Sequence, residues 1–478
     1  MSNYSSQAWA NVPAAGLDLF LDLTTTDSSA SGLRARIERG LREAIRSGRL
    51  PVGSRLPPTR ELARDLGVSR GTVLQAYEQL VAEGWLQGRT GFGTIVRVAY
   101  SDRPTEPPRR ERQPVHWQFD FRPGRPDPSS FPRRAWLRAA RQAIGSAPNH
   151  AFSIGAPQGQ LALRMELAAY LSRVRGLQAP PTRVVVTSGF IQSLGLVARS
   201  LGRRPGRVAM EDPCLPLHRA VIQAQGCEVL ALPVDGEGLQ VAHLYGRDDV
   251  GLVVVTPNRQ HPTGAVLSPQ RRAQLLAWAR RTGALILEDD YDGEFRYDRH
   301  PVGALQSLGP EVVAYAGTLS KTLSPAVRLG WLVVPKARVS AVVEQKSHSD
   351  WQSGVLEQLT FAEFLRSGAY DRHVRRMRLG YRQRRDAVVR NLARVRPDLP
   401  VVGAEAGLDL LVPVTAPTAE ASTLTAAAAL GIGLGGLAAG GYYRQGSGAG
   451  VLVGYGAALE ATFARGLEAL SAVFAGVS

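Results

Sequence analysis

The chain has 478 residues and a formal net charge of +16, so it is long enough for two or three domains, and its basic balance favours an anionic partner such as nucleic acid. Its two cysteines, Cys214 and Cys227, exclude the disulfide framework of a small secreted domain. The N-terminal residues lack the pattern of a signal peptide, and no apolar run reaches the roughly 18–20 residues of a membrane helix. We therefore expect a cytoplasmic protein with no membrane partner.

Composition divides the chain into four segments. Residues 1–30 are polar and rich in serine and threonine, which predicts a loose arm, and residues 31–98 have the pattern of three helices and a small hairpin. Residues 99–116 are proline-rich and charged, as linkers are. Residues 117–478 alternate short apolar strands with helical stretches, which predicts an α/β domain with a mostly parallel sheet. The clearest predicted strands are Val184–Thr187, Val208–Met210, Leu252–Thr256, Leu285–Leu287 and Val312–Ala316.

The second of these segments has the pattern of a helix-turn-helix unit. A second helix is predicted at about 60–66 with Thr59 as its N-cap, and a third begins at Arg70 with Ser69 as its N-cap. Gly67 lies in the tight turn between them. In this arrangement the start of the later helix enters the major groove of DNA. The first helix is predicted from an apolar residue at every fourth position, namely Leu33, Ile37, Leu41 and Ile45.

The third helix divides into two faces. Arg70, Thr72 and Gln75 lie at its start and can contact phosphates or base edges. A hairpin at 85–96 would supply a wing. From spacing alone, a small helical cap with solvated arginines is the alternative interpretation. The residues expected to face inward are Val73, Ala76, Tyr77 and Leu80.

Residues 53–94 resemble the GntR-family winged helix almost end to end. The matching strings are Gly-Ser-Arg-Leu-Pro-Pro-Thr-Arg-Glu-Leu-Ala, Gly-Val-Ser-Arg-Gly-Thr-Val and Gly-Phe-Gly-Thr. The resemblance implies an α+β winged helix-turn-helix domain that binds operator DNA, with Arg55 and Gly71 as weaker candidates for contact. The DNA-binding residues that it implies are Arg60, Ser69, Arg70, Thr72 and the wing glycine Gly93.

A lysine motif, Ala-Gly-Thr-Leu-Ser-Lys-Thr-Leu-Ser-Pro-Ala-Val-Arg-Leu-Gly-Trp, lies at 316–331. Only three of the 57 basic residues are lysines, and Lys321 is the one in this motif. Its amine can form a Schiff base with a cofactor aldehyde. The hydroxyls of Thr318 and Ser320 and the guanidinium of Arg328 can converge on a phosphate. The motif therefore favours a cofactor lysine over a lysine in a surface loop.

An acidic motif, Leu-Ile-Leu-Glu-Asp-Asp-Tyr-Asp, lies at 285–292. An acidic residue just past a buried strand can hold a protonated pyridine nitrogen, and a tyrosine two residues on can reach the phenolic oxygen of the ring. Asp289 is preferred over Asp290 for this role because of its two-residue offset from Tyr291. Taken alone, four acidic residues in five could also be a metal site or a solvated loop, but together with the lysine motif we predict no metal site.

Two further segments complete the pattern. Residues 184–192 read as strand, glycine turn and helix, and the helix N-terminus at Gly189 and Phe190 can cradle a phosphate. Residues 256–264, Thr-Pro-Asn-Arg-Gln-His-Pro-Thr-Gly, form a turn-rich loop after a strand. In this order the four motifs resemble a fold-type I aminotransferase over about 120–470. Combined with the GntR-like segment, they resemble the MocR/GabR family of regulators over nearly the whole chain.

That resemblance implies pyridoxal 5'-phosphate (PLP) as the cofactor and a head-to-tail homodimer. Lys321 would be the Schiff-base lysine, Asp289 would pair with the pyridine nitrogen, and Tyr291 would contact the ring oxygen. His261 takes the place of the usual asparagine before Pro-Thr-Gly in the cofactor site. The residues that would hold the phosphate are Gly189, Phe190, Thr318, Ser320 and Arg328.

The positions that read a substrate depart from the family. Leu215 replaces an aromatic residue that stacks on the cofactor, and Leu217 replaces an arginine that binds the ligand carboxylate in amino-acid-sensing members. Residues 451–456 lack the carboxylate-binding arginine of aminotransferases, and Arg444 is the nearest one upstream. We therefore expect the cofactor site to be retained and efficient transamination to be lost.

The main hypothesis is a PLP-dependent, DNA-binding transcription regulator that senses PLP or a small amine or amino compound. An active aminotransferase with a DNA-binding head and a regulator with a cofactor-free body are the alternatives. Ten arginines between Arg366 and Arg394 are interpreted as a solvated helix face, with a second DNA-facing surface as the alternative.

Overall fold

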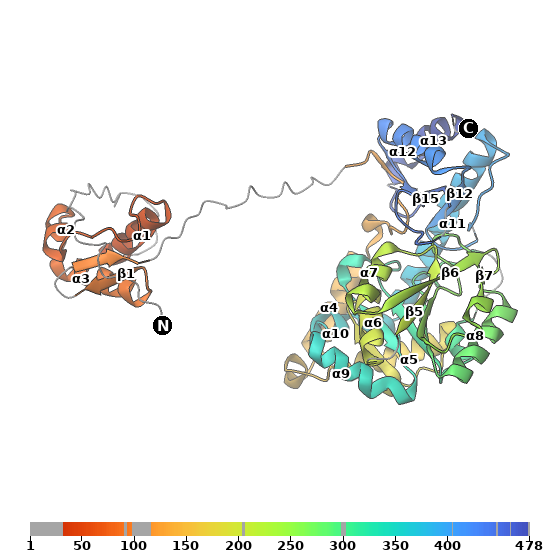
Figure 1. Ribbon diagram of the computed structural model, residues 1–478, viewed down its shortest axis with the longest axis horizontal. Helices are drawn as coiled ribbons and strands as arrows, with labels where there is room; N and C mark the ends of the chain where they lie inside the picture. Colours follow the sequence, from red (N-terminus) through yellow and green to blue (C-terminus); the bar gives the residue numbers. More distant parts are fainter. Residues whose placement is uncertain are drawn as a thin grey trace. The chain divides into compact units, whose positions relative to one another are not determined.

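The computed structural model describes residues 32–89, 93–97, 116–202, 206–297, 303–403, 405–445, 448–458 and 460–476. The predicted arm at 1–30 and nearly all of the predicted linker at 99–116 lie outside these ranges. The chain divides into two compact units, Met1–Val115 and His116–Ser478 (Figure 1). Within the ranges given, no helix is both long enough and apolar enough to cross a membrane.

The described part of the first unit, the head, contains three helices and a two-stranded hairpin. The predicted inward face of the third helix is confirmed, because Val73, Ala76, Tyr77 and Leu80 are all buried. Leu33, by contrast, is 49% exposed, so the apolar stripe of the first helix reaches the core only from Ile37 onward. The elements are α1 (Leu33–Arg46), α2 (Thr59–Asp65), α3 (Arg70–Ala82), β1 (Leu86–Arg89) and β2 (Gly93–Val96) (Figure 1).

The two predicted helix caps have different outcomes. Ser69 caps α3, and its Oγ accepts a hydrogen bond from the backbone N–H of Thr72 at 3.2 Å. Thr59 was expected to cap α2, and this prediction is wrong. Pro58 occupies the N-cap position, Thr59 is the first helical residue, and no side-chain cap bond is present within the described residues.

An eight-stranded sheet forms the centre of the second unit, the body. Its order is β4-β11-β10-β9-β8-β5-β6-β7. Strand β11 is antiparallel to both neighbours, β7 is antiparallel to β6, and the other pairs are parallel, which confirms the predicted mostly parallel sheet. The strands are β4 (Val184–Thr187), β5 (Arg207–Asp212), β6 (Glu228–Asp235), β7 (Gly238–Leu239), β8 (Val250–Val255), β9 (Leu285–Asp289), β10 (Val313–Thr318) and β11 (Gly330–Val333).

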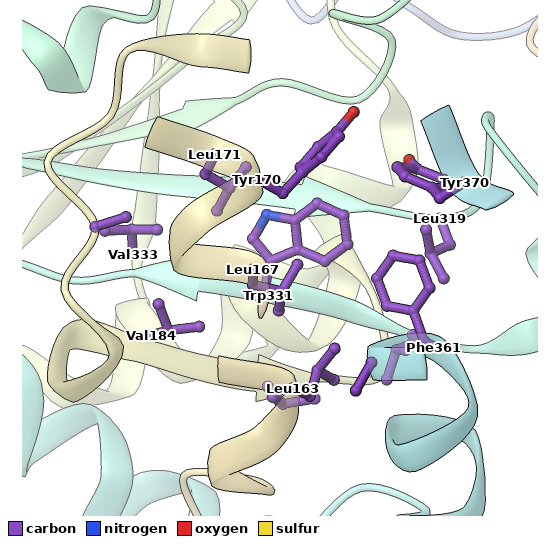
Figure 2. Close-up of a cluster of buried hydrophobic side chains, with 14 of the residues drawn as sticks. Leu163, Leu167, Tyr170, Leu171, Val184, Leu319, Trp331, Val333, Phe361 and Tyr370 are labelled. Carbon is purple, nitrogen blue, oxygen red and sulfur yellow. The ribbon is translucent and has the colours of Figure 1, made fainter. Parts of the chain in front are cut away.

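Helices cover both faces of this sheet. Successive strand residues point to opposite faces, and Trp331 and Leu332 of β11 accordingly belong to different core clusters. Figure 2 shows Trp331 packed near Leu167 and Tyr170 of α5 and Phe361 of α10. The helices of this part are α4 (Arg133–Ser146), α5 (Leu161–Arg175), α6 (Phe190–Ser200), α7 (Pro216–Ala224), α8 (Pro269–Thr282), α9 (Val339–Ser349) and α10 (Val355–Arg366).

The C-terminal residues build a smaller lobe at one end of the body (Figure 1). Its antiparallel sheet has the order β12-β15-β14. Strand β3 (Phe119–Asp120), from the start of the body, pairs with β13 (Ile432–Gly433), so the C-terminal lobe holds the first residues of the body. The remaining elements are α11 (Ala369–Val395), β12 (Asp409–Pro413), α12 (Pro417–Ala429), β14 (Gly435–Gly436), β15 (Gly450–Gly454) and α13 (Glu460–Ala475).

Apart from Arg366 at the end of α10, the arginine run lies on α11, and some of its side chains contact other parts of the body. Arg384 pairs with Asp127 at 2.9 Å, and Arg378 donates to the backbone carbonyl of Glu294 at 2.7 Å. The guanidinium of Arg385 lies 5.3 Å from the centre of the Tyr297 ring. For Arg384 and Arg385 the interpretation as a solvated face is wrong, because these half-buried side chains hold α11 against its neighbours, whereas Arg378 is exposed.

Candidate cofactor site

A cavity of about 240 Å³ lies at the carboxyl ends of β5, β8, β9 and β10. In open α/β sheets this edge is where ligands bind. Eight of the nine residues predicted to hold the cofactor line the cavity, and the ninth, Gly189, directly precedes Phe190 in its wall. The eight are Phe190, His261, Asp289, Tyr291, Thr318, Ser320, Lys321 and Arg328.

Lys321 lies in the loop that follows β10, with its amine beside the first residues of the body. Its Nζ donates a hydrogen bond to the backbone carbonyl of Gly124 at 2.5 Å. Burial lowers the pKa of the Lys321 amine, and the carboxylates of Asp409, Asp292 and Asp289 oppose this effect. A lowered pKa increases the neutral fraction of the amine, which is the form that attacks an aldehyde.

The phosphate-binding residues predicted from the sequence meet at the N-terminus of α6. The hydroxyls of Thr318 and Ser320 are 2.9 Å apart. Gly189 precedes the helix with φ +120°, and a Cβ there would lie 3.7 Å from Arg328 Nη1 and 3.9 Å from Thr318 Oγ1. Two hydroxyls, a guanidinium and the free N–H groups of a helix N-terminus form a suitable cradle for a phosphate.

The neighbouring carboxylates Asp289 and Asp290 have opposite surroundings. The carboxylate of Asp290 is fully paired within the protein. It forms an ion pair with Arg175 at 2.7 Å and accepts hydrogen bonds from Asn258 Nδ2 at 3.0 Å and Tyr315 Oη at 2.7 Å. Asp289 lines the cavity, and its buried Oδ1 has no hydrogen-bond partner among the described residues. Burial, reinforced by Asp290, raises the pKa of Asp289 well above its usual value. A protonated ring nitrogen would supply the partner that Asp289 lacks, so the residues fit PLP.

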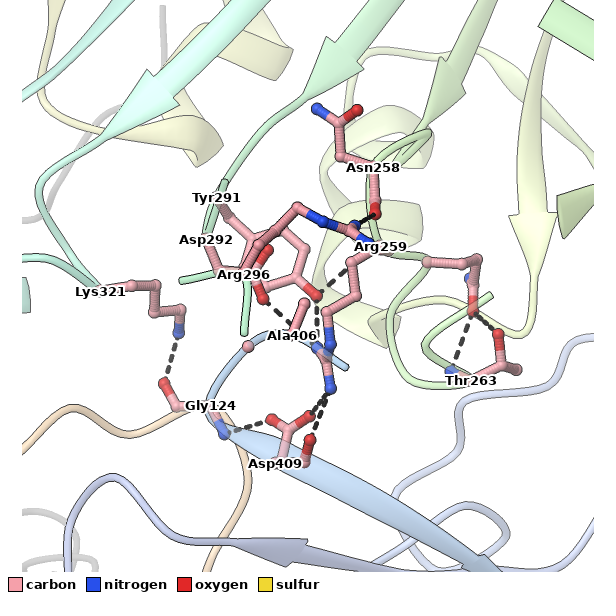
Figure 3. A network of polar contacts seen from close by, with 12 residues as sticks. Gly124, Asn258, Arg259, Thr263, Tyr291, Asp292, Arg296, Lys321, Ala406 and Asp409 are labelled. Carbon is pink, nitrogen blue, oxygen red and sulfur yellow. Dashed lines mark hydrogen bonds and ion pairs between the residues drawn. The ribbon is translucent and has the colours of Figure 1, made fainter. Parts of the chain in front are cut away.

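Arg259, which no motif in the sequence indicated, lies at the centre of a buried network (Figure 3). Its Nη1 donates to Tyr291 Oη at 2.8 Å, and its Nη2 donates to Asp409 Oδ1 at 2.7 Å. Asp292 Oδ2 is 3.4 Å from Nη1. Asp409 Oδ2 accepts the backbone N–H of Gly124 at 2.8 Å, so the network reaches the residue that Lys321 contacts. The partners Arg259 and Asp409 are 150 positions apart, and the sequence carries no local signal for their pairing.

Two histidines line the cavity without a positive charge. Burial lowers the pKa of His218 to about 3 and that of His261 to about 4. The His218 ring lies 4.8 Å from that of Phe190, between centroids. Leu215 also lines the cavity, whereas Leu217 is 58% exposed and outside the lining.

The residues predicted to contact DNA lie at three places in the head. Ser69, Arg70 and Thr72 lie at the start of α3, where Ser69 and Arg70 are exposed and Thr72 is half-buried. Gly93 begins β2 with φ +82°, and a Cβ there would lie 3.1 Å from Nε of Arg55. Of the weaker candidates, Gly71 lies between Arg70 and Thr72, and Arg55 lies beside Gly93. Arg60 is exposed on α2.

A winged helix-turn-helix followed by an aminotransferase-like body defines a class of DNA-binding regulators. Residues 33–96 match the bacterial regulatory proteins of the gntR family, and residues 126–430 match aminotransferase class I and II. The archaeal alanine:glyoxylate aminotransferase has a similar fold, with a TM-score of 0.67 and 24% identity over 74% of this chain and 90% of that one.

Two of the relatives match this chain over most of its length. The chain is 33% identical to the HTH-type pyridoxine biosynthesis transcriptional regulator PdxR of Corynebacterium glutamicum, over 80% of this chain and 82% of that protein. It is 30% identical to the probable rhizopine catabolism regulatory protein MocR of Rhizobium meliloti, over 91% and 92% of the two chains. The chain therefore belongs to the MocR/GabR family of transcription regulators. Membership of this family supports regulation over the alternative of an aminotransferase with a DNA-binding head.

Proposed function

We propose that this regulator holds PLP in the body cavity and senses PLP itself, a small amine or an amino compound. The observation that carries the proposal concerns Asp289, which lines the same cavity as Lys321 and the phosphate cradle and whose buried Oδ1 has no hydrogen-bond partner among the described residues. When bound, PLP supplies an aldehyde for a covalent link to an amine and a ring that withdraws electrons.

Each predicted residue has a role in this proposal. Lys321 would hold the aldehyde carbon, Asp289 the protonated ring nitrogen and Tyr291 the ring oxygen. The hydroxyl of Tyr291 already accepts a hydrogen bond from Arg259. His261 would cover the site from the loop before Pro262. The phosphate would be held by Gly189, Phe190, Thr318, Ser320 and Arg328.

The proposal extends to the rest of the chain. Residues 1–30 would form an arm, 31–98 the DNA-binding head, 99–116 a linker and 117–478 the body of a cytoplasmic, head-to-tail homodimer. Ligand binding to the body would change the spacing of the two heads on operator DNA. The contacts to DNA would come from Arg60, Ser69, Arg70, Thr72 and Gly93.

The cofactor part is tested by the visible absorbance of a lysine-linked pyridoxal group. Purified protein supplied with PLP should absorb visible light, and the Lys321→Ala variant should not. Lys336→Ala, on the body surface, is the matched control and should keep the colour. A wild-type protein that stays colourless with PLP would refute the cofactor site.

The DNA-binding part is tested with a fragment selected from random DNA by the wild-type protein. Arg70→Ala should abolish the specific gel shift, because its guanidinium lies at the start of the recognition helix. Arg39→Ala removes the same charge from the exposed side of α1 and should leave the shift in place. Equal binding by both variants would contradict the assignment of α3 to the major groove.

A further inference from the structure

We propose that the second ligand of the body is an amine without a carboxylate group, rather than an amino acid. The inference rests on the proposed function, since it assigns PLP to the cradle at Gly189 and a ligand to the rest of the cavity. The part left for the ligand, here called the ligand half, is lined by Gly124, Cys214, Leu215, His218, His261 and Tyr442.

Arg259, a buried arginine that contacts the cavity residue Tyr291, is already neutralised. Arg259 is 2.7 Å from the carboxylate of Asp409 and 3.4 Å from that of Asp292, and the side chains of Arg259 and Asp409 are each 2% exposed. Burial lowers the pKa of the Arg259 guanidinium, but Tyr291, Asp409 and Asp292 raise it by more, so it stays charged and paired. A ligand carboxylate would have to displace a buried carboxylate that already holds this guanidinium in place.

The other arginines around the ligand half also have partners within the protein. The guanidinium of Arg219 donates to the backbone carbonyls of Cys214 at 3.0 Å and Tyr442 at 2.5 Å, where it fixes the cavity wall. The guanidinium of Arg444 donates to the carbonyl of Val229 and lies outside the lining. Arg125, next to Gly124, is 3.9 Å from the carboxylate of Asp120, is 52% exposed and also lies outside the lining. Among the described residues, none that lines the ligand half is an arginine or a lysine, and burying an unpaired carboxylate is costly.

The ligand half does offer acceptors for an ammonium group. The amine of Lys321 itself marks the position, because its Nζ donates a hydrogen bond to the carbonyl of Gly124. Once Lys321 is tied to the cofactor, the Gly124 carbonyl loses this donor. An amine ligand can replace it there, next to Asp409, which the Gly124 N–H contacts at 2.8 Å.

The test uses full-length protein loaded with PLP and two matched pairs of compounds: tyramine with tyrosine, and cadaverine with lysine. Binding is followed by titration calorimetry and by the change in cofactor absorbance. In each pair we expect the amine to bind at least ~10-fold more tightly than the amino acid, since the two differ by one carboxylate. If the PLP-loaded protein is coloured but binds the amino acid as tightly as the amine or more tightly, or binds neither member of a pair, the inference about the ligand is wrong and the cofactor site stands. A protein that stays colourless with PLP overturns both the cofactor site and the inference about the ligand.

A variant tests the role of the neutralised arginine. Asp409→Asn keeps the size of the side chain and removes the charge that balances Arg259. It should lower the preference for amine over amino acid by about 10-fold. Asp398→Asn, at an exposed position of the C-terminal part, should leave the preference unchanged. A folded Asp409→Asn protein with the wild-type preference contradicts the role of Arg259, and if this variant fails to fold, the comparison of the wild-type pairs decides.

Discussion

Asparagine at Asp289 and asparagine at Asp290 should give opposite phenotypes, although the two residues are neighbours on the chain. Asp289 lines the cavity and its buried Oδ1 has no partner in the described part of the chain, so its exchange removes only the charged acceptor for the cofactor ring. A hydrogen bond to a charged group contributes about 1.5–3 kcal/mol, so the Kd for PLP should rise roughly 10- to 150-fold. The free energy of unfolding without cofactor should change little, because a neutral amide is easier to bury than a carboxylate.

Asp290 should behave in the reverse way. Its ion pair with Arg175 joins side chains that are 2% and 7% exposed, and Tyr315 and Asn258 hydrogen-bond to the same carboxylate. Removing one partner of a buried pair costs about 3–5 kcal/mol, because the other charge is left without compensation. The Asp290→Asn protein that still folds should bind PLP with nearly the wild-type Kd.

Both variants are measured in the same two assays. Urea unfolding of the cofactor-free protein, followed by tryptophan fluorescence, reports stability, and absorbance titration with PLP reports affinity. The assignment of the two carboxylates is refuted if Asp290→Asn weakens PLP binding more than Asp289→Asn does while the Asp290→Asn protein unfolds at the same urea concentration as the wild type.

Three further predictions concern stability. His373 is 2% exposed and burial lowers its pKa to about 4, whereas an unfolded histidine titrates near 6.5. The free energy of unfolding should therefore fall by up to about 3 kcal/mol as the pH drops from about 6.5 to 4. In urea unfolding measured over this pH range, His373→Gln should show a weaker dependence on pH. Gly189→Ala introduces a side chain at φ +120° beside Arg328, and should cost about 1–3 kcal/mol of unfolding free energy and weaken PLP binding; a variant that binds PLP normally counts against the phosphate cradle. Ser69→Ala removes the cap of α3, which contributes about 1 kcal/mol, so amide exchange in this helix should be roughly fivefold faster, and unchanged exchange would show that the cap is dispensable.

Local patterns in the sequence predicted much of the fold and the cofactor half of the site. The inward residues of α3 recur at helical spacing, and the predicted strand Val184–Thr187 has the bounds of β4. The groups around Lys321 could be recognised because Thr318, Ser320 and Arg328 lie within ten residues of each other on a loop and its flanks. Such features depend on backbone geometry over a few residues, and side-chain spacing records that geometry.

The surroundings of the two neighbouring aspartates mark the limit of this reasoning. The offset from Tyr291 indicated Asp289 for the ring nitrogen, but the partners of Asp290 could not be named. Arg175 and Asn258 come from a helix and a loop elsewhere in the chain, and only the packed sheet brings them to one carboxylate.

The sequence by itself determined that this chain joins a GntR-type head to an aminotransferase-like body and that Lys321 is its cofactor lysine candidate. Only the tertiary structure decided which charges remain available for a ligand. Arg259 meets Asp409 across 150 positions, and Lys321 meets Gly124 across 197. Contacts of this kind have no periodicity along the chain, because they depend on which loops the folded sheet and the C-terminal lobe bring to the same cavity.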